Sequence, residues 1–381
     1  MRAAIISLGS VSSKWTLEAL RKYFKKVDSI DLRKIEVDLG QQSPLVLYQG
    51  KQLPEYDCIY LKGSFRYIQA LRSIATALEN KAVMPISATA FTIGHDKLLT
   101  HLTLQQHKIP MPETYIAVNP LAAKELLERL SYPVVMKFPS GTQGKGVMFA
   151  DSYNSAVSLF DALSVLNQPV IIQKYVETGG KDIRAIVAGD KVIAAMERQA
   201  VEGERRANIH AGGRGKPVEL DKQTKDIAIK TAKAVGASIC AVDILRSNKG
   251  PLVIEVNLSP GLQGITEATK INVADKIARY LYETTSRLKG TATVPEEHDA
   301  DINTGDDAKT IIADVTFDKN RIVLPEIVTN LSQLSTGDEM LINVEKNSIT
   351  ISKSKSLPGT VHIKEKSTIK NIIKKKKSQK R

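Results

Sequence analysis

The stretch PLVIEVNLSPG, residues 251–261, decides how the rest of the sequence is interpreted. Most of it is apolar, as in a strand buried in a core, yet Glu255 and Asn257 interrupt it two residues apart. Residues i and i+2 of a strand point to the same face, so the carboxylate and the amide converge. Burying both without a partner would be costly. The pattern therefore predicts a ligand, and oxygen atoms of this kind suit a divalent cation.

A second carboxylate joins this pair if two strands are neighbours. Asp243 lies in the apolar run AVDIL, and a turn at residues 248–250 would bring that run beside the first stretch. Asp243, Glu255 and Asn257 then form a predicted site for magnesium, completed by phosphate oxygens. The alternative is that all three face water at a sheet edge. That interpretation fits one acid better than it fits three polar residues on two apolar strands.

A glycine-rich loop supplies a candidate phosphate site. The segment SGTQGKG, residues 140–146, does not match a Walker A loop, because a strand follows it where a helix is required. It is typical of a hairpin flap whose Gly141, Gly144 and Gly146 bring backbone N–H groups close to phosphates. Lys137 ends the apolar run before the flap and needs an anion there. A plain hairpin turn with a solvent-reaching lysine is the alternative.

Together these residues resemble the ATP-grasp superfamily, and within it the RimK family of ligases that add glutamate to a ribosomal protein's C-terminus. The resemblance covers residues 96 to about 285 well and the N-terminal part loosely. It does not extend to residues 290–381. The motifs that carry it are Lys97, the Lys137 strand with its flap, QKYV (173–176), DIRAIV (182–187), ERQAVEGERRANIHAGG (197–213) and VDILRSNKGPLVIEVNLSPGLQGI (242–265).

The resemblance implies a role for each of the motif positions. The ATP-binding set is Lys97, Lys137, Gly141, Gly144, Gly146, Lys174, Tyr175, Asp182, Arg206, Ala207 and Asn208. The catalytic and substrate set is Arg184, Arg198, Arg206, His210, Ser259 and Gly261, and for His210 a purely structural role is equally open. Asp243, Glu255 and Asn257 would hold two magnesium or manganese ions.

Two positions depart from the family pattern. Lys174 stands where the family has an acid in the hinge that contacts adenine. Gln199 stands where a second arginine is expected. The first matters little if backbone groups read the adenine. The second lies on the substrate side, so it leaves the preference for glutamate open.

The implied reaction needs little covalent work from the protein. A carboxylate attacks the γ-phosphoryl group to give an acyl phosphate, and an amine then displaces phosphate. Catalysis of this kind consists of positioning and charge neutralisation by metal, lysines and arginines. That agrees with a sequence in which we identify neither a Ser-His-Asp triad nor a catalytic cysteine.

The predicted fold class is α/β: an ATP-grasp fold preceded by a small α/β domain and followed by a small β-rich unit. A Gly189-Asp190 hairpin and a helix capped by Gly236 lie within the ATP-grasp part. The predicted boundaries are 1–95 for the N-terminal domain, 96–289 for the ATP-grasp domain, 290–308 for a linker, 309–353 for the β-rich unit and 354–381 for a basic tail.

The C-terminal part accounts for most of the net charge of +13. The segment from Lys353 to Arg381 contains eleven Lys or Arg and one acid. Residues 309–353 resemble half of an AbrB/SpoVT-type swapped hairpin, which predicts a homo-oligomer because such a unit buries its face against a second copy. The tail predicts contact with nucleic acid or a ribosome through phosphates, or else a solvated segment.

Three functions remain open from sequence. The first is a ligase that adds glutamate or another amino acid to a protein or peptide acceptor, ribosomal or otherwise. The second is a ligase of the same fold that acts on a small molecule. The third is a nucleotide-sensing, DNA-binding regulator. No apolar run approaches the roughly 18–20 residues that cross a bilayer, and both cysteines lie in apolar runs, so we expect a cytoplasmic protein without a membrane partner.

Overall fold

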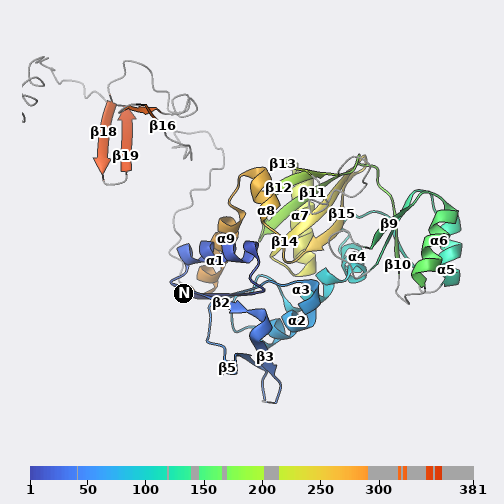
Figure 1. Ribbon diagram of the computed structural model, residues 1–381, viewed down its shortest axis with the longest axis horizontal. Coiled ribbons are helices and arrows are strands. Elements are labelled where there is room, and N and C mark those ends of the chain that lie inside the picture. The colour runs from blue at the N-terminus through green and yellow to red at the C-terminus, as the bar shows by residue number, and fades with distance from the viewer. Residues whose placement is uncertain are drawn as a thin grey trace, which may run out of the picture. The chain divides into compact units, whose positions relative to one another are not determined.

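The computed structural model describes residues 1–40, 42–117, 120–138, 146–164, 170–200 and 214–290, and four short strands between residues 316 and 353 (Figure 1). The chain divides into two compact units, Met1–Pro295 and Glu296–Arg381, each described by itself. Predicted residues Gly141, Gly144, Arg206, Ala207, Asn208 and His210 lie outside the described residues, as do the predicted linker and basic tail.

The N-terminal sheet is parallel, with the strand order β2-β1-β6. Its central and final strands are almost wholly buried, as their apolar sequences require. A small antiparallel sheet, β3-β4-β5, follows β2. The elements are β1 (Arg2–Ser7), α1 (Val11–Tyr23), β2 (Lys26–Asp31), η1 (Leu32–Lys34), β3 (Ile35–Asp38), β4 (Leu45–Tyr48), β5 (Lys51–Gln52), β6 (Cys58–Leu61), η2 (Phe65–Tyr67), α2 (Ile68–Ala77) and α3 (Ala88–His95).

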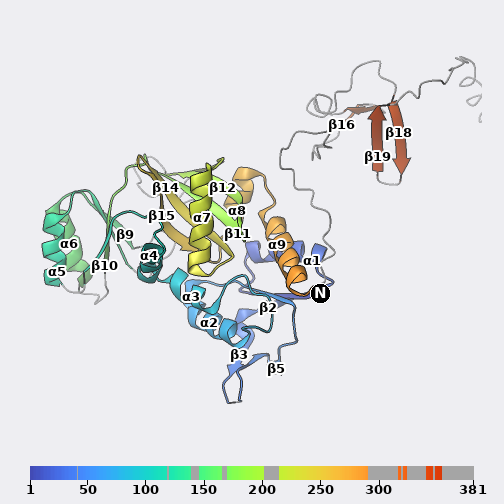
Figure 2. The same ribbon diagram turned by 180° about the vertical axis from the view of Figure 1, so that it is seen from behind.

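A five-stranded antiparallel sheet, ordered β13-β12-β11-β14-β15, forms the centre of the first unit. Figure 2 shows α7 lying across one face of it. The predicted hairpin is confirmed, because Ala188 pairs with Lys191, and Gly236 caps α7 at φ +79°. The elements are α4 (Lys97–Gln106), β11 (Lys181–Ala188), β12 (Lys191–Gln199), β13 (Arg214–Pro217), α7 (Lys222–Val235), β14 (Ile239–Ser247), β15 (Gly250–Asn257), α8 (Gln263–Thr269) and α9 (Val273–Leu288).

A bulge in β15 shapes the stretch of residues 251–261. Asp243 pairs with Glu255 and Ile244 pairs with Val253, which leaves Ile254 as the extra residue. The bulge lets Val253 and Val256 both enter the core while Ile254 and Glu255 both line the cleft described below. The predicted pairing of the two strands is confirmed.

A smaller lobe carries the Lys137 strand. Its antiparallel sheet has the order β7-β10-β8-β9, and two helices cover it. Its buried core, which includes Leu127, Met136 and Phe160, is separate from the larger core running from Ala3 to Leu281. The elements are β7 (Thr114–Ala117), α5 (Pro120–Arg129), β8 (Val134–Lys137), β9 (Val147–Ala150), α6 (Tyr153–Ser164) and β10 (Val170–Lys174).

The second unit contains two short antiparallel pairs among its described residues. They are β16 (Thr316–Asp318) with β17 (Arg321–Val323), and β18 (Met340–Glu345) with β19 (Ser348–Lys353). Pairing with a second copy of the chain stays a prediction. Across the described parts of the chain, no helix has the length and apolar character needed to span a bilayer.

Candidate active site

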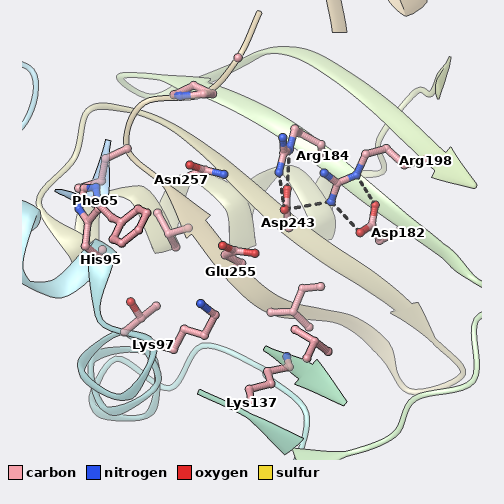
Figure 3. Close-up of a pocket in the computed structure, with 18 of the residues that line it drawn as sticks. Phe65, His95, Lys97, Lys137, Asp182, Arg184, Arg198, Asp243, Glu255 and Asn257 are labelled. Carbon is pink, nitrogen blue, oxygen red and sulfur yellow. Dashed lines mark hydrogen bonds and ion pairs between the residues drawn. The ribbon is translucent and has the colours of Figure 1, made fainter. Parts of the chain in front are cut away.

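The predicted residues meet in one cleft of about 850 Å³. Its walls come from the small lobe, the five-stranded sheet and the N-terminal sheet, and Figure 3 shows the side chains that converge there. The predicted residues that line it are Lys97, Lys137, Lys174, Tyr175, Asp182, Arg184, Arg198, Asp243, Glu255, Asn257, Ser259 and Gly261. Gly146 is described but is not among the lining residues.

Lys137 is fixed by a chain of buried polar side chains. It ends β8 with 9% exposure, and its Nζ donates to Oε1 of Gln173 at 2.6 Å. The Gln173 amide nitrogen in turn contacts Thr114 Oγ1 at 2.8 Å and His101 Nε2 at 3.1 Å. His101 Nδ1 lies 2.5 Å from the backbone oxygen of Lys97. The two predicted phosphate-binding lysines are therefore linked through His101 and Gln173.

The network is satisfied when His101 is neutral. The two amide hydrogens of Gln173 serve Thr114 and His101, so His101 Nε2 accepts and Nδ1–H donates to the Lys97 carbonyl. Burial, with the nearby lysines, lowers the pKa of His101 to about 4. Burial also lowers the pKa of Lys137 to about 8, against the opposing effect of the Glu255 carboxylate. With these pKa values, Lys137 carries a positive charge at neutral pH and His101 is neutral.

Two arginines hold the two aspartates of the sheet. Arg184 binds Asp243 with two hydrogen bonds of 2.8 and 2.7 Å. Arg198 binds Asp182 with two hydrogen bonds of 2.6 Å each, and its Nη2 lies 2.9 Å from Asp243 Oδ2. Paired geometry of this kind compensates three buried charges and the half-buried charge of Arg184.

The two aspartates share Arg198 but differ in their number of cations. Burial would raise the pKa of Asp243, but Arg184 and Arg198 together hold it below its usual range. Burial, with the nearby Asp243 carboxylate, raises the pKa of Asp182, which is hydrogen-bonded to one guanidinium, that of Arg198. Asp243 is therefore the carboxylate that stays ionised over the wider pH range.

Glu255 and Asn257 point into the cleft from β15 (Figure 3). Glu255 lies directly across from Asp243, a like-charge pairing that is unfavourable unless compensated. The arginines compensate Asp243, and neither Glu255 nor Asn257 has a hydrogen-bond partner within the described residues. A carboxylate and an amide oxygen open to the cleft fit a magnesium ion. Within the described residues Asp243 Oδ1 accepts only from Arg184, which leaves a lone pair on that oxygen for a further ligand.

Among the described residues, no three His, Cys, Asp or Glu side chains are grouped so that they could hold a metal ion. The predicted set contains two carboxylates and an amide, so phosphate oxygens would have to supply the remaining ligands.

The hinge after β10 has its backbone donors occupied. The amide of Lys174 donates to the Glu113 carbonyl at 2.9 Å, and that of Tyr175 donates to the Pro133 carbonyl at 3.3 Å. The Tyr175 ring packs edge-on against Phe149, with ring centroids 5.9 Å apart. This end of the cleft therefore offers an aromatic and aliphatic surface suited to a flat base.

The Ser259-Gly261 turn is tied to the N-terminal sheet. Ser259 Oγ accepts from the Gly63 amide at 3.1 Å, and the Pro260 carbonyl lies 3.4 Å from Lys62 Nζ. Ser12 Oγ accepts from the Leu262 amide at 2.8 Å. The Ser259 hydroxyl thus has a docking role in addition to its predicted place beside the substrate.

Comparisons with known proteins agree with this geometry. Residues 94–281 match the family described as "RimK-like ATP-grasp domain". The chain is 37% identical over 298 residues to a "Probable alpha-L-glutamate ligase" of Marinomonas sp. (strain MWYL1), covering 77% of this chain and 99% of that relative.

The chain belongs to the RimK-like ATP-grasp family.

Solved structures show the same fold. The ATP-grasp ligase PsnB, in complex with a variant of its minimal precursor, Mg and ADP, superposes with a TM-score of 0.58 at 18% identity, covering 74% of this chain and 97% of that one. The D-cycloserine synthetase DcsG superposes with a TM-score of 0.55 at 14% identity, covering 75% and 100%. At these identities the likeness carries the RimK-like fold alone.

Sequence reasoning missed three members of this RimK-like site. His101 lies one helical turn after Lys97, and Gln173 precedes the hinge lysine, so spacing could have indicated both. Lys62 directly follows the buried strand β6 and Lys137 is the last residue of the buried strand β8, so a lysine after an apolar run marks both. Thr114, which also contacts Gln173, carries no sequence signal that distinguishes it from an ordinary strand residue.

Proposed function

We propose that the protein is an ATP- and magnesium-dependent ligase that joins a carboxylate to an amine, adding glutamate or another amino acid to the C-terminus of a protein or peptide. One observation carries the proposal. The chain matches nearly the whole length of a curated relative named as a probable alpha-L-glutamate ligase at 37% identity. The arrangement of lysines, acids and arginines in the cleft supports it.

The proposed reaction has two steps, and different residues of the cleft act on the phosphates and on the metal. In the first, an acceptor carboxylate oxygen bonds to the γ-phosphorus and ADP leaves. In the second, the amine nitrogen bonds to the acyl carbon, phosphate leaves and the amine loses a proton. Lys97 and Lys137 hold phosphate oxygens, and Glu255 and Asn257, with Asp243, hold the metal. Magnesium, when bound, neutralises charge on the phosphate oxygens.

The arginines act on the charge that develops during transfer. Arg184 faces the cleft with a 15% exposed side chain, whereas Arg198 is 5% exposed behind it. Arg184 contacts the transferring phosphoryl group or the acyl oxygen, and Arg198 keeps it in place through their shared Asp243. Asp182 positions Arg198.

The amino acid, the acceptor and the oligomeric state are proposed from the sequence. Glutamate is the favoured amino acid, with Gln199 as the departure that leaves another open. A ribosomal acceptor, nucleic-acid contact through the basic tail and self-association through residues 309–353 are proposals that rest on sequence.

The test is ADP release across the twenty amino acids, with and without a ribosomal extract, followed by intact-mass analysis of the extract. We expect amino-acid-dependent ADP release and mass steps of one residue on a protein. Release only with a small-molecule extract would favour the small-molecule ligase. ATP binding without any turnover would favour the nucleotide-sensing regulator.

The same assay tests Glu255. We expect Glu255→Ala to lower turnover by about 100-fold or more, because a metal-binding carboxylate is lost. Glu79→Ala, which removes an exposed carboxylate of the N-terminal part, is the matched control and should leave turnover unchanged. Full activity of Glu255→Ala would contradict the metal assignment.

A further inference from the structure

The N-terminal sheet has the topology of a ligand-binding edge. Its central strand β1 is followed by α1 and then by β2 on one side, while β6 arrives later on the other side. In parallel sheets, ligands bind at the carboxyl ends of strands where the order switches in this way. One wall of the cleft comes from that edge. It is lined by Leu8, Ser10, Ser12 and Ser13 after β1 and by residues 62–66 after β6.

Lys62 is the exceptional residue at this edge. It is 3% exposed, it lines the cleft, and its Nζ lies 5.3 Å from the centroid of the Tyr60 ring. Its hydrogen-bond acceptor is the Pro260 carbonyl at a long 3.4 Å. Within the described residues no carboxylate forms an ion pair with it. A buried ammonium without an anion is costly, and a ligand anion would remove that cost.

The first turn of α1 meets the same end of the cleft. Ser10, Ser12 and Ser13 line it, and α1 runs for 13 residues from Val11. Ser10 Oγ accepts from the Ser13 N–H at 3.2 Å, whereas the N–H groups of Val11 and Ser12 have no partner within the described residues. Unpartnered N–H groups of a first helical turn favour a negative charge. Phe65 and Arg66 continue this wall to the exposed rim, where Phe65 is 40% exposed. The edge therefore combines a buried cation, helix donors and an exposed aromatic side chain.

We propose that Lys62 and the first turn of α1 bind a substrate carboxylate that keeps its charge throughout the reaction. This inference rests on the proposed ligase function. The reacting carboxylate becomes a neutral amide carbonyl, so a fixed cation suits a different, permanent anion. The phosphates are assigned to two other lysines, Lys97 on α4 and Lys137 on β8. Two sources offer such an anion: the α-carboxylate of the incoming amino acid, and an acidic side chain of the acceptor.

The experiment compares Lys62→Met with Lys62→Arg, and with Lys81→Met as a matched control. Lys81 is an exposed lysine of the N-terminal part that contacts the Pro44 carbonyl outside the cleft. Steady-state ADP release gives KM separately for ATP, amino acid and acceptor. We expect Lys62→Met to raise KM for one of the two carboxylate-bearing substrates at least 10-fold, with KM for ATP unchanged. Lys62→Arg should restore most of the affinity, and Lys81→Met should match the wild type.

The substrate whose KM rises identifies the source of the carboxylate. If it is the amino acid, the wild type should prefer L-glutamate to its α-amide, and Lys62→Met should lose that preference. If it is the acceptor, a peptide ending in two glutamates should lose its advantage over one ending in two glutamines. Unchanged KM values for both substrates, or a change confined to ATP, would overturn the proposal.

A failure of the ligase function itself is separable. If the wild type releases no ADP with any amino acid, calorimetry with L-glutamate and its α-amide, in the presence of ADP and magnesium, replaces kinetics. Binding of glutamate that is at least 10-fold weaker in Lys62→Met would still support the subsite. A peptide ending in two glutamates, compared with one ending in two glutamines, tests the acceptor source in the same way. Equal binding of both carboxylate ligands to the two proteins, or binding of neither ligand to either protein, would refute the subsite.

Discussion

Lys62 and Lys137 are two buried lysines of the same cleft in opposite situations. Each follows or ends an apolar buried strand, and burial lowers the pKa of each to about 8. Lys137 donates a 2.6 Å hydrogen bond to Gln173, and the Glu255 carboxylate stabilises its positive charge. Lys62 has one contact, of 3.4 Å, to the Pro260 carbonyl. The same sequence signal thus yields one lysine that Gln173 holds in place and one to which the described residues offer no anion.

Among the tests that distinguish the two lysines, the largest effect is expected on the turnover of a Lys137 variant. Lys137→Met removes a preorganised cation from the phosphate site, so turnover should fall by about 100- to 1,000-fold. The loss should appear in kcat at saturating amino acid and acceptor, unlike the KM effect expected at Lys62. ADP release under saturating conditions measures it. If Lys137→Met instead changed only the KM for the amino acid, the two lysines would have equivalent roles and the distinction between them would be wrong.

The second test is the stability of the ligand-free protein. For Lys62, a folded-state pKa of about 8 against 10.5 means that burial opposes folding at pH 7 by on the order of 3 kcal/mol. This penalty is full below pH 8 and disappears as pH rises through 10.5. Lys62→Met should therefore stabilise the free protein at pH 7 by up to that amount, as measured by urea unfolding.

Lys137→Met supplies the contrast in the same measurement. Removing that ammonium leaves Gln173 Oε1 without its donor, a loss of about 1–3 kcal/mol that offsets the relief of burial. We expect little or no stabilisation from it. If Lys62→Met proved less stable than the wild type, Lys62 would have to be satisfied within the free protein.

The third and smallest test concerns acid. His101 has a pKa of about 4 when folded and 6.5 when unfolded, so the unfolded state binds more protons between these values. Its contribution to stability is full above pH 6.5 and is lost as pH falls to 4, by up to about 3 kcal/mol. Urea midpoints between pH 7 and 4.5 should fall more steeply for the wild type than for His101→Gln. His107→Gln, at an exposed position just after the same helix, should retain the wild-type slope.

Strongly periodic parts of the sequence predicted their structure well. The apolar strand of residues 251–257, the Gly189-Asp190 hairpin and the Gly236 cap occur as expected, because alternation and turn residues determine local structure. The i, i+2 rule placed Glu255 and Asn257 on one face correctly. It could not reveal the bulge at Ile254, which depends on pairing with β14.

Other features depend on partners that spacing does not specify. The strand β2, KVDSID, mixes charges into a half-buried edge and has no clear period, so the sequence did not indicate it. The sequence marked Asp182, Arg184, Arg198 and Asp243 as site residues, but the cross-strand pairing of arginines with aspartates follows from register. The roles assigned to the predicted residues stay predictions until the experiments above are done.

The two separate hydrophobic cores have a consequence for how the molecule opens. The small lobe carries its own buried residues, so its sheet and helices can lose structure while the larger core persists. Amide hydrogen exchange should then distinguish two cooperative units in the free protein. A nucleotide bound as proposed, with its phosphates at Lys137 of the small lobe and its metal at Glu255 of the five-stranded sheet, would bind only when both parts are folded. Its binding energy therefore links two otherwise independent unfolding equilibria into one.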